Sequence, residues 1–268
     1  MSTYTSVAAV AVGCLASQAA ATDGPINWWT FDSVGAVTVS PAAGAASGTV
    51  FAPAAIVAGG VGPLGLGALD TRNGGWVNFG PILPLTSGDF TISVWVLSNN
   101  ATNNSTSVAG RFATGSANGY ALRVNLDAAG FGDIGAASFY QSGTPGTTAV
   151  GTSTVIDGAN WHHIAATYVS GGSLRLYVDG MLDANVPARA ILPSTAPFLV
   201  GGIYSTPSAA TVNAFSGLID DLQVYDRALT ADEVAFLTAN PGRSVPTPAA
   251  AGVLLGLAAA TRRRRAAR

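Results

Sequence analysis

The chain has 268 residues, of which 49% are hydrophobic and 10% are charged, and its formal net charge at pH 7 is −2. All fourteen acidic residues lie between residues 22 and 243, where there are seven arginines and no lysine, so this part carries a formal charge of −7. An acidic domain of this kind repels polyanions, which excludes nucleic acid as a partner. Its length of about 220 residues fits one all-β domain.

Residues 1–21 are predicted to be a signal peptide. An apolar stretch is followed by small residues, with Ala19 and Ala21 in the A-x-A arrangement of a cleavage site, although no Lys or Arg precedes the apolar stretch. The alternative is a lipoprotein signal, because the only cysteine, Cys14, ends an AVGC sequence. The residues after Cys14 stay apolar, which favours cleavage after Ala21 and leaves the mature chain without a cysteine.

The region after the signal peptide is predicted to consist mainly of short β-strands. In residues 89–98, apolar and small polar residues alternate with the period of two that is typical of a strand. Similar strands are predicted at residues 119–126, 137–143, 161–169, 173–180, 198–202 and 217–225. Residues 99–107, rich in Asn, Ser and Thr, are predicted to be a loop, and residues 36–55 carry too few signals to be placed.

One helix is predicted, over residues 228–240. Thr230 and Glu233 have the spacing of a capping box at its start, and Val234, Phe236 and Leu237 supply an apolar face. Many short strands with one terminal helix predict an all-β fold, an antiparallel two-sheet jelly-roll sandwich with a short C-terminal helix and then an apolar C-terminal segment.

Six segments resemble, in order, the laminin-G-like jelly rolls of the concanavalin A type found in bacterial surface proteins. They are GLGALD (65–70), WVNF (76–79), DFTISVWV (89–96), DGANWHHIAATY (157–168), LRLYVDG (174–180) and FSGLIDDLQVYDRALTADEV (215–234). The resemblance runs from about Trp28 to Leu237 and implies a concanavalin A-like fold. This fold carries lectins, adhesion modules, enzymes and inert spacers, so it does not fix the function.

The carboxylates do not form an obvious catalytic pair. Glycoside hydrolysis needs two of them about 5–10 Å apart, yet the only glutamate, Glu233, is assigned to the helix cap. Asp220 and Asp221 are adjacent in a predicted strand, so their side chains should point to opposite faces. His162 and His163 are also adjacent in a predicted strand, so their side chains should point to opposite faces. They fit a structural strand better than a metal or acid-base site. We therefore expect no enzymatic activity.

Exposed aromatic rings are the best candidates for contacts with a sugar. We predict that Trp76, Tyr120, Tyr140 and Tyr204 contact a ligand, with core packing as the alternative for each. The sequence thus favours a non-catalytic carbohydrate-binding or adhesion module of an exported bacterial surface or matrix protein, whose partner is an extracellular polysaccharide or a surface protein. The alternatives are a structural surface protein without a small ligand and a divergent polysaccharide-acting enzyme.

Asp220 is a candidate metal ligand. Regular alternation places it on the same face as Leu222 and Val224, which we expect to be the core face, with Asp221 on the other. A buried carboxylate needs hydrogen bonds or a cation. The resemblance implies that the first and last strands pair, which would bring Asp32 close, and that a structural Ca²⁺ is possible. We expect Asp220→Ala to destabilise the domain and Asp221→Ala to be nearly silent.

The C-terminal segment, residues 244–268, follows the domain at 22–243. Residues 249–260 are wholly apolar but shorter than the ~20 residues of a membrane-spanning helix. The segment resembles the PEP-CTERM sorting signals of exported proteins, with Thr247 in place of the usual glutamate. The residues that carry this resemblance are Pro246, Pro248, Arg262, Arg263, Arg264 and Arg265. It implies export and sorting machinery as partners, transient contact with the inner membrane, and a location at the cell surface. The alternative is a frayed apolar tail.

Overall fold

The computed structural model describes residues 24–60, 65–98, 106–114, 118–124, 134–141, 147–156, 158–205, 211–212 and 214–246. The signal peptide predicted at residues 1–21 lies outside these residues, as does the sorting signal from Thr247 onward, including Pro248 and the four consecutive arginines. Within the described part of the chain, no helix is long and apolar enough to cross a membrane.

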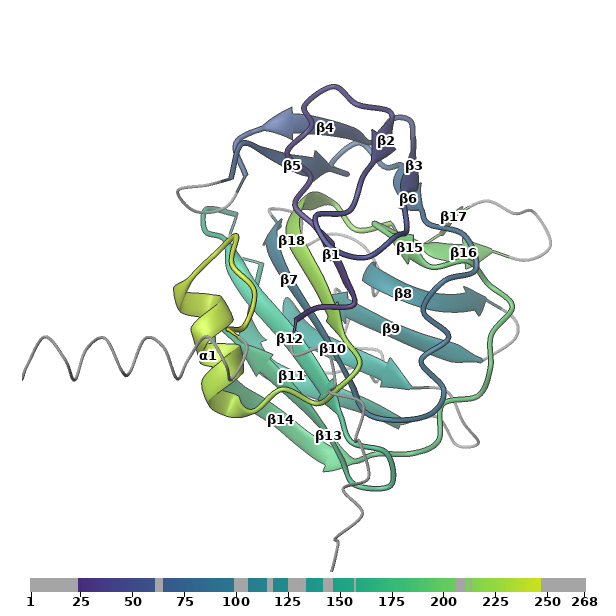
Figure 1. The fold of residues 1–268 in the computed structure, drawn as a ribbon, viewed down its shortest axis with the longest axis vertical. Coiled ribbons are helices and arrows are strands. Elements are labelled where there is room, and N and C mark those ends of the chain that lie inside the picture. Colours follow the sequence, from purple (N-terminus) through teal and green to yellow (C-terminus); the bar gives the residue numbers. More distant parts are fainter. Residues whose placement is uncertain are drawn as a thin grey trace, which may run out of the picture.

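The described residues form two β-sheets that face each other (Figure 1). Sheet A contains, in spatial order, β14 (Met181–Pro187), β13 (Ser173–Val178), β12 (His162–Tyr168), β7 (Phe90–Ser98), β18 (Gly217–Tyr225), β5 (Gly67–Asp70) and β4 (Ala55–Ala58), and β1 (Asn27–Trp29) also pairs with β18. Sheet B contains β11 (Thr147–Thr154), β10 (Ala136–Gln141), β9 (Gly119–Val124), β8 (Thr106–Thr114), β15 (Leu199–Val200), β6 (Trp76–Asn78), β3 (Gly48–Phe51) and β2 (Thr38–Val39), with β16 (Ile203–Ser205) paired to β8 and to β17 (Thr211–Val212).

The core lies between the two sheets and follows the alternation of the strands. In the central strand β7, Ile92, Val94 and Val96 are completely buried and belong to the inter-sheet core. Trp29 packs there against Phe79, with ring centroids 4.3 Å apart. The prediction of an all-β, two-sheet antiparallel sandwich is confirmed, and β16 with β8 is a parallel pair within it. Residues 36–55, which the sequence could not place, supply β2 and β3.

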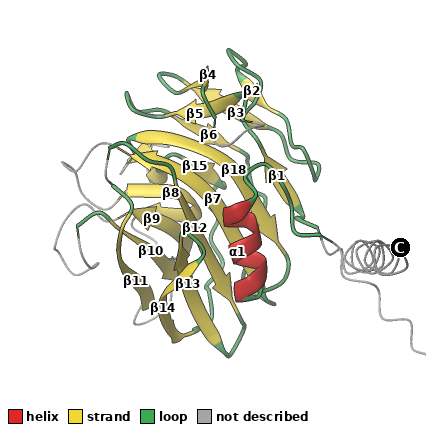
Figure 2. Cartoon of the chain, turned by 90° about the vertical axis from the view of Figure 1, so that its left-hand side faces the viewer, coloured by secondary structure: helices red, strands yellow, loops and turns green. Residues whose placement is uncertain are grey.

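The predicted helix, α1 (Ala231–Ala239), lies on the outer face of sheet A (Figure 2). Its start is the expected capping box between Thr230 and Glu233. Val234 and Leu237 pack with Tyr225 and Val245 in a second, smaller apolar cluster. Because Val245 is buried in this cluster, the folded part of the chain continues past residue 243, where the sequence placed the end of the domain.

His163 links three elements at this interface. Its Nε2 lies 2.8 Å from Ser93 Oγ of β7, and its Nδ1 lies 2.8 Å from Thr238 Oγ1 of α1. The imidazole is completely buried, and this burial lowers its pKa from the usual 6.5 to about 4. His163 is therefore a neutral, structural histidine, in line with the packed alternative for this position. The neighbouring His162 instead pairs with Asp179, 2.8 Å away.

The burial of His163 makes stability depend on pH in a defined direction. Its folded pKa lies below its unfolded value, so its contribution is complete above pH 6.5 and is lost as the pH falls toward 4. We expect the wild-type free energy of unfolding to fall by up to about 1.4 kcal/mol per pH unit over this range because of this one group. Chemical denaturation at several pH values should show a shallower slope for His163→Gln. His162→Gln is the control, and a wild-type slope in H163Q would contradict the assignment.

Candidate functional site at the junction of β1, β5 and β18

The last strand, β18, changes partner along one of its edges. One edge pairs with β7, while the other pairs first with β5, at Leu218 and Ile219, and then with β1, at Leu222 to Val224. Asp220 and Asp221 lie between these two ladders. The chain that leaves β1 passes this point with Phe31 at φ 50°, and Asp221 itself has φ 49°. Asp is one of the few residues that enter this left-handed region readily, so the sequence is locally suited to the irregularity.

The irregularity is a β-bulge, and it changes which side chains face the core. The register against β7 shifts between Asp220 and Gln223. As a result, Ile219 and Leu222 both join the inter-sheet core, whereas Asp220 and Asp221 line the same pocket on the outer side. The predictions that Asp220 faces the core and that the two aspartates point to opposite faces were therefore wrong. The extra residue of the bulge breaks the alternation on which both rested.

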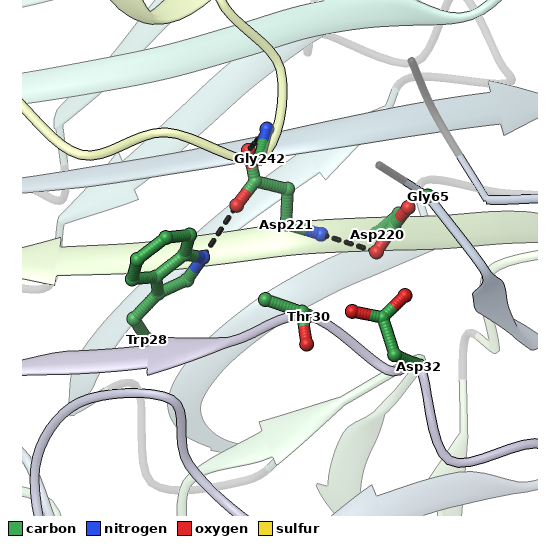
Figure 3. Close-up of a pocket in the computed structure, with 7 residues that line it drawn as sticks. All are labelled: Trp28, Thr30, Asp32, Gly65, Asp220, Asp221 and Gly242. Atoms are coloured by element: carbon green, nitrogen blue, oxygen red, sulfur yellow. Dashed lines mark hydrogen bonds between the residues drawn. The ribbon is translucent and has the colours of Figure 1, made fainter. Parts of the chain in front are cut away.

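The pocket has a volume of about 160 Å³ (Figure 3). It is lined by Trp28, Thr30, Asp32, Gly65, Asp220, Asp221 and Gly242. The Asp32 carboxylate extends toward that of Asp220 in Figure 3, so the two predicted metal ligands lie in one pocket. Gly60 closes over Asp220: a Cβ there would lie 2.6 Å from Asp220 Oδ2 and 2.1 Å from the Gly67 carbonyl oxygen. Only glycine fits this close approach.

Backbone amides hold the Asp32 and Asp220 carboxylates. Asp32 Oδ1 accepts hydrogen bonds from Leu66 N at 2.9 Å and Gly67 N at 3.2 Å. Asp220 Oδ1 accepts one from Asp221 N at 2.7 Å, and its side chain is almost fully buried. Each pattern fixes the carboxylate's direction. These backbone donors are neutral.

Asp221 has a different role from its two neighbours. Its Oδ1 accepts from Trp28 Nε1 and from Gln223 Nε2, the latter at 3.0 Å, and its Oδ2 accepts from Gly242 N at 2.8 Å. Burial raises its pKa, while these three donors act in the opposite direction. Both oxygens are thus committed to holding β1, β18 and the C-terminal segment together. Sequence reasoning missed this role because it needs a contact with Gly242, 21 residues further along.

Among the described residues that line the pocket, the ligands available to a cation are oxygen atoms. Hard cations such as Ca²⁺ prefer carboxylate and carbonyl oxygens. Within the described ranges, no group of three or more His, Cys, Asp or Glu residues has the arrangement of a metal site. A cation between Asp32 and Asp220 would therefore need backbone carbonyls and water for its remaining ligands. The assignment of these residues as metal ligands stays a prediction.

Two of the four predicted ligand contacts lie on the outer face of sheet B. Trp76 is half-buried and pairs with Phe51, which is 40% exposed; the rings stack at 5.3 Å with an interplanar angle of 9°. Tyr140 is half-buried, with its ring 5.0 Å from that of Phe112, and the guanidinium of Arg123 lies 4.9 Å from the Tyr140 ring. Both positions keep a ring on the outer surface.

The other two predicted ligand contacts, Tyr204 and Tyr120, have different surroundings. Tyr204 is half-buried on β16, beside Ala113 of β8. Tyr120 is only 1% exposed, and its hydroxyl donates to the Leu83 carbonyl oxygen at 2.7 Å. The prediction of an exposed Tyr120 ring was wrong, because the alternation of side chains along β9 places this residue in the inter-sheet core.

Residues 71–235, more than half of the chain, match the laminin-G-type family described as the concanavalin A-like lectin/glucanases superfamily. The chain belongs to this superfamily. This confirms the resemblance that the sequence motifs indicated. The sequence has no significant match among curated proteins.

Solved structures with the same fold include a domain of an extracellular arabinanase and the binding domain of a mosquitocidal protein. Domain 4 of AbnA, a GH43 extracellular arabinanase from Geobacillus stearothermophilus solved in complex with arabinotriose, is 19% identical with a TM-score of 0.60, over 81% of this chain and 99% of that domain. The binding domain of Paraclostridial Mosquitocidal Protein 1 is 17% identical with a TM-score of 0.56, over 81% of this chain and 52% of that one. At these identities the likeness shows the fold alone.

The hydrogen bonds of Asp221 predict that its loss is costly, which reverses the sequence-based expectation of a silent substitution. Asp221→Ala should lower the free energy of unfolding by roughly 1–3 kcal/mol, because one buried and two partly buried donors lose their acceptor. Asp221→Gly separates this loss from backbone strain, since glycine adopts the positive φ freely. Denaturation curves of both variants are compared with those of Asp226→Ala, an exposed control. Equal, small shifts in all three would refute the role of Asp221.

Proposed function

We propose that this protein is an exported bacterial surface protein whose domain is a non-catalytic carbohydrate-binding module for an extracellular polysaccharide. The observation that carries the proposal is the stacked pair of Phe51 and Trp76 on the outer face of sheet B. Sugar rings pack their apolar faces on exposed aromatic rings, and the neighbouring polar groups fix their orientation. Arg72 and Asn73 are exposed in the turn that leads into Trp76 and can supply such groups.

The pocket that contains Asp32, Asp220 and Asp221, called the aspartate pocket from here on, supports a non-catalytic role through its chemistry. A general acid for glycoside hydrolysis must present a protonated carboxyl to the substrate. The pKa of Asp221 is raised by burial, but both of its oxygens accept hydrogen bonds from the protein. Both oxygens are turned toward the protein donors that they hold, so Asp221 is poorly placed to donate a proton to a glycosidic bond. This argues against the alternative of a divergent polysaccharide-acting enzyme.

The proposal includes a structural Ca²⁺ between Asp32 and Asp220. These carboxylates and nearby carbonyl groups have the hard oxygen chemistry that Ca²⁺ prefers. Export is proposed on the terminal segments of the sequence, with sorting through residues 244–268 and transient contact of this segment with the inner membrane. A structural matrix protein without a small ligand is the competing function.

Substitution of Trp76 tests the carbohydrate-binding function. We expect a glycan array, with arabino-oligosaccharides included, to show binding to the full chain, and Trp76→Ala to weaken it by roughly tenfold, the effect of about 1.4 kcal/mol. Leu182→Ala, which removes an exposed apolar side chain from β14 of the other sheet, should bind as wild type does. Absence of binding to any glycan by the wild-type chain would favour the matrix protein. Release of products from a bound glycan would instead show an enzyme.

Thermal melts test the Ca²⁺ site separately. A free Ca²⁺ concentration of 100 times its dissociation constant should stabilise the wild-type domain by about 2.7 kcal/mol relative to the same domain with a chelator. Asp32→Asn and Asp220→Asn should each abolish this response because each removes a ligand charge. Asp226→Asn, at an exposed position, should keep it. An identical wild-type melt with Ca²⁺ and with chelator would remove Ca²⁺ from the proposal.

A further inference from the structure

A second hollow lies on the outer face of sheet A, next to the aspartate pocket. It is a groove of about 560 Å³, a size typical of ligand sites. The groove is lined by Trp28, Phe236, Asn240, Gly242, Arg243, Ser244 and Pro246. Trp28 and Gly242 also line the aspartate pocket, so the two hollows share a wall. Pro246 belongs to the predicted sorting signal, and none of Trp76, Tyr120, Tyr140 and Tyr204 lines this groove.

The walls of the groove are held in place before any ligand arrives. Asp221 accepts hydrogen bonds from both Trp28 Nε1 and Gly242 N, which ties the indole to the C-terminal segment. Gln223 Nε2 donates to the Arg243 carbonyl oxygen at 2.9 Å. Two residues later, Val245 N donates to the Tyr225 hydroxyl at 3.3 Å. Alternate side chains of β18 thus fix successive residues of the C-terminal segment. Preorganisation of this kind lowers the entropic cost of binding.

The polar atoms of the groove suit a neutral sugar. Asn240 Nδ2 donates to the Phe236 carbonyl oxygen, which leaves its Oδ1 as an acceptor. Arg243 is exposed, and its guanidinium forms no hydrogen bond or ion pair with the described residues. Aromatic rings flanked by such donors and acceptors match the apolar faces and hydroxyl groups of a saccharide. An acidic saccharide fits less well, because the adjoining pocket holds three aspartates in a domain with a formal charge of −7.

We infer that this groove is a second binding site for a neutral saccharide, and that the domain can bridge two polysaccharide chains. This inference rests on the proposed function. Trp28 lies on the outer face of sheet A, whereas Phe51 and Trp76 lie on the outer face of sheet B. The two sites therefore open on opposite sides of the sandwich, so one polysaccharide chain bound at each side is cross-linked through the protein.

Cross-linking distinguishes this inference from the proposed function itself. The full chain should raise the turbidity or viscosity of a solution of a neutral polysaccharide that it binds. Arg243→Ala and Trp28→Ala should abolish the cross-linking but retain binding at the Trp76 site. Calorimetry with a short oligosaccharide should show two binding sites in the wild type and one in each variant. Trp76→Ala should also lose cross-linking, and the double variant Trp76→Ala with Arg243→Ala should lose binding.

Controls keep the outcomes separate. Arg189→Ala removes an exposed arginine outside the groove and should cross-link as wild type does. Thermal melts establish that each variant is folded, which matters for Trp28→Ala because Asp221 loses a donor; the exposed Arg243 carries no such cost. One site in the wild type, or full cross-linking by R243A, would overturn the second site while leaving the proposed function intact. No binding at all by the wild type would overturn the proposed function as well.

Discussion

The buried carboxylate of Asp221 is the interaction on which this end of the structure depends. The ladder of β18 changes partner from β5 to β1 at this residue, and a bulge with a left-handed residue must form there. Three donors from β1, β18 and the C-terminal segment converge on the carboxylate. The hydrogen bonds from these donors offset the free-energy cost of removing the carboxylate from water. Without this acceptor, Trp28 and Gly242 would have no common partner, and both hollows would lose this connection between β1 and the C-terminal segment.

The bulge explains why acidic groups gather on one side of sheet A. In a regular strand, Asp220 and Asp221 would be separated by the sheet, and one would sit in the inter-sheet core. The extra residue places both on the outer side and lets Ile219 and Leu222 fill the core instead. Asp32 reaches the same place because Phe31 also adopts a left-handed backbone and because β1 ends there. Two local irregularities, one within β18 and one just after β1, therefore build the pocket.

Periodicity predicted the regular parts of this fold and failed where the period breaks. The strand at 89–98, the helix with its Thr230 and Glu233 cap, and the pairing of the first and last strands all follow from local pattern or family resemblance. The face of Asp220 did not, because it was inferred by alternation from Leu222 and Val224, and the bulge lies between them and Asp220. Tyr120 shows a second limit: an aromatic residue in a strand of mixed pattern gives no sign of which face is covered. The role of Asp221 depends on distant Gly242, which no local window contains.

The outer face of sheet A has two parts with different roles, and the side chains of β18 show where one part ends and the other begins. Tyr225 at the end of the strand belongs to the apolar cluster that seats α1, where neutral His163 fixes the helix to β7 and β12. Asp220 and Asp221 at the bulge line an open pocket. Gln223 lies between them and holds the chain segment that leads away from the helix. In a strand that was regular throughout, one of the two aspartates would have faced the inter-sheet core instead. The bulge leaves part of the outer face open, and there the polar groups that could recognise a ligand are held.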